Sequence, residues 1–353
     1  MCRPMGQVLP AVFVAFAISL GSRSLAALSS AHSDSVRSFA TQSSSLFDDQ
    51  EFDIKKLQEQ LQVARDSGDI RSAAYDLNQI GLFSYEKAKF ADAELAFTES
   101  LAFYHQLGNR EMEATVVGEI AITQDSLGQF QEALVSHAKA LPIWRGLGNR
   151  EQEAATLGKI GEVFRRLKDF KEALYFDQAA LPIYLEVGDR SGQAAELNNI
   201  GLAYFGVGKR KNAIAFFNQA KDAYYALGKK DCEAKVARNL AVTYFTLGDS
   251  KRALLLLNHA LQIQRGVGDR NAQASTLYSM GLVYSGLGNS EIARDCYDQA
   301  LSIYRETSDR QSEALIMTAL ERVDSKKAQR RPKSRRNDRD SQQAALSLSP
   351  PAN

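Results

Sequence analysis

Seven alanines stand at intervals of 40 residues along this chain, and no insertion or deletion interrupts the series. The column runs through Ala74, Ala114, Ala154, Ala194, Ala234, Ala274 and Ala314. A second column, of glycines in one phase, comprises Gly68, Gly108, Gly148, Gly188, Gly228 and Gly268. A fixed period of 20–50 residues is typical of a solenoid, in which each unit packs only on its neighbours. The sequence therefore predicts a tandem array that offers mainly binding surface.

Each 40-residue unit contains two helical patterns separated by a turn. In residues 191–230, Ala194, Leu197 and Gly201 follow the spacing of one helical face, and the pattern restarts with Ala213 and Phe217. The glycine column marks helix ends, where the left-handed conformation is needed. The polar residues that follow these glycines are expected N-caps: Asn109, Asn149, Asp189, Asp269 and Asp309. Each repeat is thus predicted to be an antiparallel helix pair.

The repeat resembles the tetratricopeptide repeat in its long, 40-residue form, similar to Pins-type scaffolds, kinesin light chains and bacterial arrays. The resemblance rests on the following residues: Ile200, Gly201, Tyr204, Ala213, Phe217 and Ala220, together with the recurring turn string G-[DN]-R. The position that is usually tryptophan in the family holds leucine, valine or alanine here. The resemblance implies an all-α fold, a right-handed α-solenoid of antiparallel helix pairs.

The predicted domain organisation has four parts. A signal-peptide-like leader (1–31) and a disordered linker (32–50) precede a solenoid over 51–327, and a basic disordered tail (328–353) follows it. The solenoid comprises six full repeats over 71–310 and a half repeat at each end.

The two ends of the chain point to different compartments. Arg3 precedes the uncharged stretch 9–20, and small-residue sites follow, a layout typical of a secretory signal peptide. The serine-rich, acid-poor composition of residues 1–46 also suits an organellar transit peptide or a plain leader. We expect a secreted or periplasmic protein, with an organelle-targeted or cytoplasmic one as the alternative.

The tail is the most basic part of the chain. Residues Lys326–Arg336 hold seven Lys or Arg and no acid. This run is a solvated charge cluster, a nuclear localisation signal, or a weak contact for nucleic acid or anionic lipid.

The chemistry-bearing residues are scattered, and the sequence predicts no enzyme, cofactor, metal or small-molecule substrate. The four histidines lie apart from any Cys or acidic cluster at ligand spacing. No Gly-rich phosphate loop follows a strand pattern, and too few residues follow the array for a peptidase domain.

A peptide-binding groove is the predicted functional site. In the family that this chain resembles, the first helix of each pair lines a concave groove. The resemblance then places these residues in the groove: Asn78, Gln79, Lys159, Arg165, Arg166, Asn198, Asn199, Lys235, Arg238 and Asn239. Amides suit an extended peptide backbone and the cations suit an acidic one. We expect a scaffold for a protein or peptide partner, with self-assembly through the convex face or a contact made by the tail as alternatives.

Overall fold

The computed structural model describes residues 54–330, and every regular element among them is a helix. Their contacts divide them into two compact units, and the boundary in the sequence falls between Leu247 and Gly248. Unit 1 contains ten helices: α3 (Ile54–Ser67), α4 (Ile70–Glu86), α5 (Phe90–Gln106), α6 (Arg110–Ser126), α7 (Phe130–Leu147), α8 (Arg150–Arg166), α9 (Phe170–Val187), α10 (Arg190–Gly206), α11 (Arg210–Ala226) and α12 (Lys230–Thr246). Unit 2 contains four: α13 (Ser250–Val267), α14 (Arg270–Gly286), α15 (Ser290–Glu306) and α16 (Arg310–Arg330).

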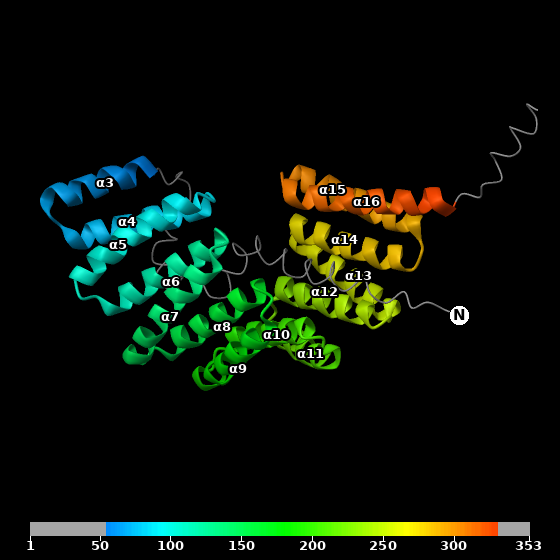
Figure 1. The fold of residues 1–353 in the computed structure, drawn as a ribbon, viewed down its shortest axis with the longest axis horizontal. Helices are drawn as coiled ribbons and strands as arrows, with labels where there is room; N and C mark the ends of the chain where they lie inside the picture. The colour runs from blue at the N-terminus through cyan, green and yellow to red at the C-terminus, as the bar shows by residue number, and fades with distance from the viewer. Residues whose placement is uncertain (1–53, 331–353) are drawn as a thin grey trace, which may run out of the picture. The chain divides into compact units, whose positions relative to one another are not determined.

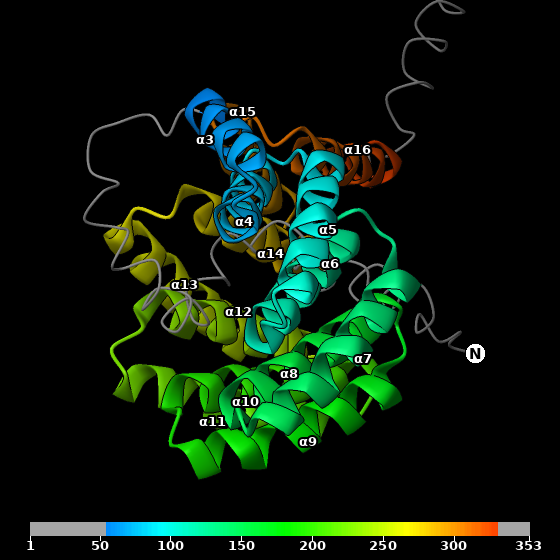
Figure 2. The ribbon, with the colours of Figure 1, turned by 90° about the vertical axis from the view of Figure 1, so that its left-hand side faces the viewer.

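The predicted repeat of helix pairs is confirmed. Neighbouring helices pack on one another along each unit, as Figures 1 and 2 show. The half repeat at the start is α3, which buries Leu57 and Leu61. The last helix is α16, and Ala314 at its start is exposed, unlike the other six alanines of its column. The leader, the linker and most of the tail lie outside the described residues; of the basic run, residues 326–330 continue α16.

The turns form as their residues predict. Gly188 adopts φ 74° and ends α9 in the left-handed conformation. The next residue, Asp189, accepts hydrogen bonds from the backbone N–H groups of Ser191 and Gly192, both at 2.9 Å, and caps α10. The other expected caps make the same kind of bond: Asn109, Asn149, Asp269 and Asp309. Consecutive helices therefore start and stop at fixed points of the 40-residue period.

Small residues bring the two helices of each pair close together. Ala74, Ala194 and Ala213 have no exposed surface. Gly201 faces the ring of Phe217, and a Cβ added to this glycine would lie 2.6 Å from Phe217 Cδ1. Because that distance is well below contact distance, the Phe217 ring fits here only when residue 201 is a glycine.

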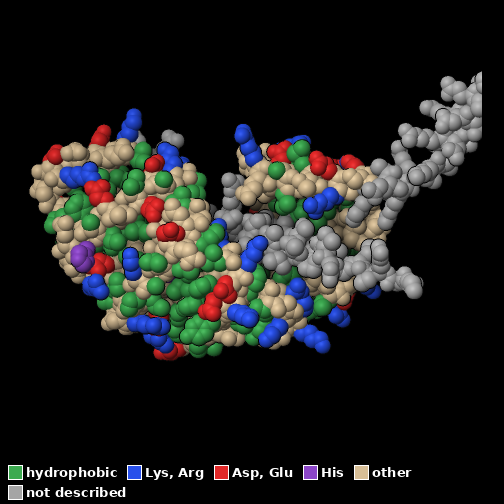
Figure 3. Space-filling model, viewed as in Figure 1, with side chains coloured by type: hydrophobic (Ala, Val, Ile, Leu, Met, Phe, Trp, Pro, Cys, Tyr) green, Lys and Arg blue, Asp and Glu red, His purple; other side chains and the backbone are tan. Residues whose placement is uncertain are grey.

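Unit 1 has an inner layer made of first helices. Besides its neighbours along the chain, α10 contacts both α8 and α12, the first helices of the adjacent pairs. In Figures 1 and 2, α9 and α11 both lie along one side of the row formed by α8 and α10. The face of α8, α10 and α12 that points away from α9 and α11 is called the inner face below. In the view of Figure 3, basic and acidic side chains are interspersed over unit 1 with apolar ones between them.

Candidate peptide-binding face

All ten predicted groove residues lie on first helices of unit 1. Asn78 and Gln79 belong to α4, and Lys159, Arg165 and Arg166 to α8. α10 carries Asn198 and Asn199, and α12 carries Lys235, Arg238 and Asn239. Arg165 and Asn78 are buried, and the other eight are partly exposed.

The asparagines form hydrogen bonds from one inner helix to the next. The Asn239 amide Nδ2 donates to Asn198 Oδ1 at 3.0 Å, which ties α12 to α10. Asn78 Nδ2 donates to Glu119 Oε2 at 2.5 Å and ties α4 to α6. Because an amide carries two donor hydrogens and an acceptor with two lone pairs, the partly exposed pair Asn198 and Asn239 keeps further capacity for a peptide backbone.

The cations of α8, which the sequence places in the groove, each have a carboxylate partner. Lys159 Nζ lies 3.1 Å from Glu162 Oε2, with side chains 27% and 22% exposed. Arg166 pairs with Asp125 of α6 and lies over the ring of Phe130, 5.1 Å from its centroid. The positive charge of Lys159 and Arg166 is therefore largely compensated by acids of α8 and α6.

Lys235 and Arg238 lie about one turn apart on α12. Burial lowers the pKa of Lys235 to about 8, and the nearby charge of Arg238 acts in the same direction, while Glu162 opposes it. Below this pH, Lys235 carries a positive charge whose hydration is incomplete, so an incoming carboxylate would stabilise it. Glu119 shows the opposite balance: burial raises its pKa to about 8 although Asn78 hydrogen-bonds to it. Near neutral pH, Glu119 is thus mostly uncharged and does not repel an anion.

Arg165 serves the interior of unit 1. Its side chain is 7% exposed, and its guanidinium is paired with Asp177 of α9, which has no exposed surface. Glu196 of α10 is also buried; burial first, and then the charge of Asp177, raise its pKa well above the ordinary value. A side-chain hydrogen bond also joins Glu196 to Asp177, so that one buried polar group links α8, α9 and α10.

One residue of the sequence, Asp177, indicates this buried group, although the sequence analysis did not single it out. Asp177 occupies the position that holds Phe97 in the first repeat and Phe217 in the fourth. Opposite it stands Gly161, whose absent Cβ leaves room for Asp177 Oδ1. An acid in an otherwise apolar column marks a buried polar contact whose partners only the fold reveals.

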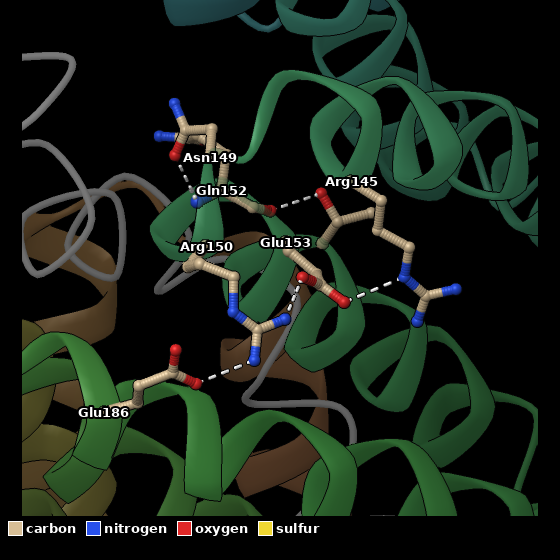
Figure 4. A network of polar contacts seen from close by, with 7 residues as sticks. Arg145, Asn149, Arg150, Gln152, Glu153 and Glu186 are labelled. Atoms are coloured by element: carbon tan, nitrogen blue, oxygen red, sulfur yellow. Dashed lines mark hydrogen bonds and ion pairs between the residues drawn. The ribbon is translucent and has the colours of Figure 1, made fainter.

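The recurring turn string G-[DN]-R has a structural role. In the third repeat, Arg150 pairs with Glu153 and also reaches Glu186, with Nη2–Oε2 at 2.8 Å. Arg145 of the preceding helix binds the second oxygen of Glu153 at 2.8 Å (Figure 4). Burial acts to raise the pKa of Glu153, but the hydrogen bonds from Arg145 and Arg150 outweigh it and lower the pKa. In unit 2, Arg270 bonds Glu306 at 2.6 Å in the same way. The motif arginine thus joins the two helices of a pair, and Arg145 joins that pair to the preceding helix.

The family model described as tetratricopeptide repeat matches residues 111–186, 192–266 and 234–306, more than half of the chain. The chain belongs to the tetratricopeptide repeat family. The resemblance seen in the sequence is thereby confirmed, together with the all-α solenoid that it implies. No curated protein was found to match by sequence.

Solved structures of other tetratricopeptide-type proteins share the fold at low sequence identity. Aspartyl phosphate phosphatase F from Bacillus subtilis is 14% identical, with a TM-score of 0.60 over 74% of this chain and 73% of its own. The Rap conjugation gene regulator of the plasmid pLS20, solved in complex with the Phr* peptide, is 16% identical, with a TM-score of 0.52 over 75% and 76%. BtubC from P. vanneervenii is 21% identical, with a TM-score of 0.52 over 63% and 90%.

Residues 54–330 contain neither a membrane-spanning helix nor a cluster of metal-ligating side chains. Within 54–330, none of the helices is long and apolar enough to cross a membrane. Side chains of His, Cys, Asp and Glu in the described part of the chain do not cluster in a way that would hold a metal ion.

Proposed function

We propose that this tetratricopeptide repeat protein is a non-enzymatic scaffold whose unit 1 binds an extended peptide with acidic side chains on the inner face. The observation that carries the proposal is the row formed by Asn198, Asn239 and Lys235. It combines amide groups that suit a peptide backbone with a poorly hydrated cation that suits a carboxylate. A peptide complex of a protein with the same fold supports the proposal.

The direct test is charge reversal on α12. We expect the Lys235→Glu/Arg238→Glu double variant to weaken binding of acidic peptides by about a hundredfold or more, since like charges would now face each other. The measurement is fluorescence titration of the full chain with a library of eight-residue peptides rich in Asp and Glu. The same peptides with Asn and Gln in place of the acids show how much of the affinity depends on charge.

A matched control is available on the outer helices. Lys171 of α9 and Lys211 of α11 are exposed at the starts of their helices. The Lys171→Glu/Lys211→Glu variant makes the same change of net charge and should bind as the wild type does. Equal loss in both double variants would show a nonspecific charge effect, and no loss in either would contradict the inner-face assignment.

The affinity for acidic peptides should also decrease at alkaline pH. Lys235 has a pKa of about 8 in the unliganded protein, and a bound carboxylate favours its protonated form. Binding above pH 8 must therefore take up a proton, and the affinity should fall by up to about tenfold between pH 7 and pH 9. Lys235→Arg, which stays charged over this range, should remove most of the pH dependence. A wild-type titration that does not change with pH would show that Lys235 makes no contact with the peptide.

A further inference from the structure

A small pocket lies between α6, α7 and α8. It is about the size of one water molecule. Its walls are Ile122, Asp125, His137, Lys159, Glu162 and Val163. All of these except His137 belong to the first helices α6 and α8, so the pocket lies beside the face proposed to bind the peptide.

Two residues that line the pocket each carry a buried polar atom without a hydrogen-bond partner among the described residues: Asp125 Oδ1 and His137 Nδ1. Their side chains are well buried, since Asp125 is 5% exposed and His137 is 3% exposed. The other oxygen of Asp125 accepts from Arg166, so this carboxylate is held in place. Buried polar groups in folded proteins nearly always have partners, and each unpaired one costs about 1–3 kcal/mol. Both atoms therefore need a ligand atom or a water.

His137 is not required for packing. It occupies the column that holds Phe97, Phe217, Leu257 and Tyr297 in other repeats. The small residue opposite it is Ala121, and the fifth repeat pairs Ala241 with Leu257, both almost fully buried. A leucine would thus satisfy the core at position 137, whereas the imidazole introduces a polar atom without a partner.

The charges around the pocket select the chemistry of an occupant. Burial lowers the pKa of His137 to about 3, and Lys159 acts in the same direction, so the imidazole is neutral. Burial raises the pKa of Asp125 to about 6 despite the opposing charge of Arg166, which leaves it mainly ionised at pH 7. A cation would meet Lys159 and Arg166, and an anion would meet Asp125 and Glu162. A neutral group that both donates and accepts a hydrogen bond satisfies the site, and a hydroxyl is the smallest such group on a side chain.

We propose that this pocket, the hydroxyl pocket, receives the hydroxyl of a serine or threonine in the peptide bound on the inner face. The hydroxyl donates to Asp125 Oδ1 and accepts from the imidazole N–H of His137 or from Lys159. The inference rests on the proposed peptide-binding function and adds sequence selectivity to it. A phosphate would not fit in the pocket, because the pocket has the volume of one water molecule. Two carboxylates in its wall, Asp125 and Glu162, would also repel a phosphate.

The test is an array of acidic peptides probed with the full chain at pH 7. Each peptide that the wild type binds is remade with serine, threonine, alanine, valine or phosphoserine at every position in turn. One position should prefer serine or threonine over alanine or valine by roughly tenfold, as expected when two buried polar atoms gain partners. Phosphoserine at that position should bind more weakly than serine, although the peptide gains negative charge.

A matched variant assigns the preference to the pocket. His137→Leu reproduces the Ala241–Leu257 packing and should keep the fold, which circular dichroism checks. It should bind the alanine peptide as the wild type does and show no preference for serine. The comparison of peptides on the wild-type protein does not depend on this variant.

Each other outcome overturns the inference. Acidic peptides that bind without a serine or threonine preference, or a preference that survives in His137→Leu, would leave the proposed function intact and show that the pocket holds only water. Tighter binding of phosphoserine would indicate an anion site instead. A wild-type chain that binds no peptide on the array would overturn both the inference and the proposed function.

Discussion

Asp177→Phe is expected to lower the free energy of unfolding of unit 1 by about 3–5 kcal/mol, because it removes the carboxylate that pairs with buried Arg165. A steric clash is not the reason for this loss. Gly161 stands opposite position 177, as Gly201 stands opposite Phe217, so the structure already shows a phenylalanine accommodated in that arrangement. The cost comes from a guanidinium left in the interior without its counter-charge.

The measurement uses the single tryptophan of the chain. Trp144 lies in α7 and is 4% exposed, so its fluorescence follows the unfolding of unit 1 in urea. The Arg165→Phe/Asp177→Phe double variant copies Phe205 and Phe217 of the next repeat, both buried, and should recover most of the loss. If Arg165→Phe and Asp177→Phe each change the free energy of unfolding only slightly, and their effects are additive in the double variant, the ion pair does not contribute the stability proposed for it.

Phe217→Ala is the second large effect, with an expected loss of about 3–5 kcal/mol. The ring is 1% exposed and lies directly over Gly201, which has no side chain to fill the space left behind. Part of the cavity therefore persists, and the lost dispersion contacts are not replaced. Urea unfolding followed through Trp144 again gives the difference from the wild type.

The glycine opposite provides the control for this prediction. Gly201→Ala alone should destabilise unit 1 by about 1–3 kcal/mol, because the new Cβ overlaps the Phe217 ring. Combined with Phe217→Leu, the same substitution should stabilise, since the pair then matches Ala241 and Leu257, which are both buried. If Gly201→Ala destabilised unit 1 in the Phe217→Leu background as well, positions 201 and 217 would not pack on each other as described.

The fold was readable from the sequence because its determinants are local and repeated. Gly188 and Asp189 end one helix and cap the next with bonds that span only a few residues. Ala194 and Ala213 recur at a fixed phase, and their burial follows from the spacing alone. The spacing of these residues therefore predicts the face on which each helix packs. The same pattern recurs in six repeats, which makes the prediction unambiguous.

The candidate site was predicted less completely. The sequence named Lys159, Arg165 and Arg166 as cations of a groove, and it had no means of pairing them. The structure brings Asp177 of the following helix to Arg165, and Asp125 of the preceding repeat to Arg166. These two pairs are 12 and 41 positions apart in the sequence. Whether such residues touch depends on the packing angle of the helices and on side-chain rotamers, which the repeat pattern does not specify.

The sequence by itself determined the repeat, the helix pairs, their turns and the family, because these follow from periodicity and from short-range hydrogen bonding. Only the tertiary structure decided which charges neutralise each other and that the array separates into two compact units. It also decided that His137 and Asp125 share the wall of one pocket. The physical reason is that electrostatic and hydrogen-bond energies depend on distance and burial, which vary at every repeat although the period does not.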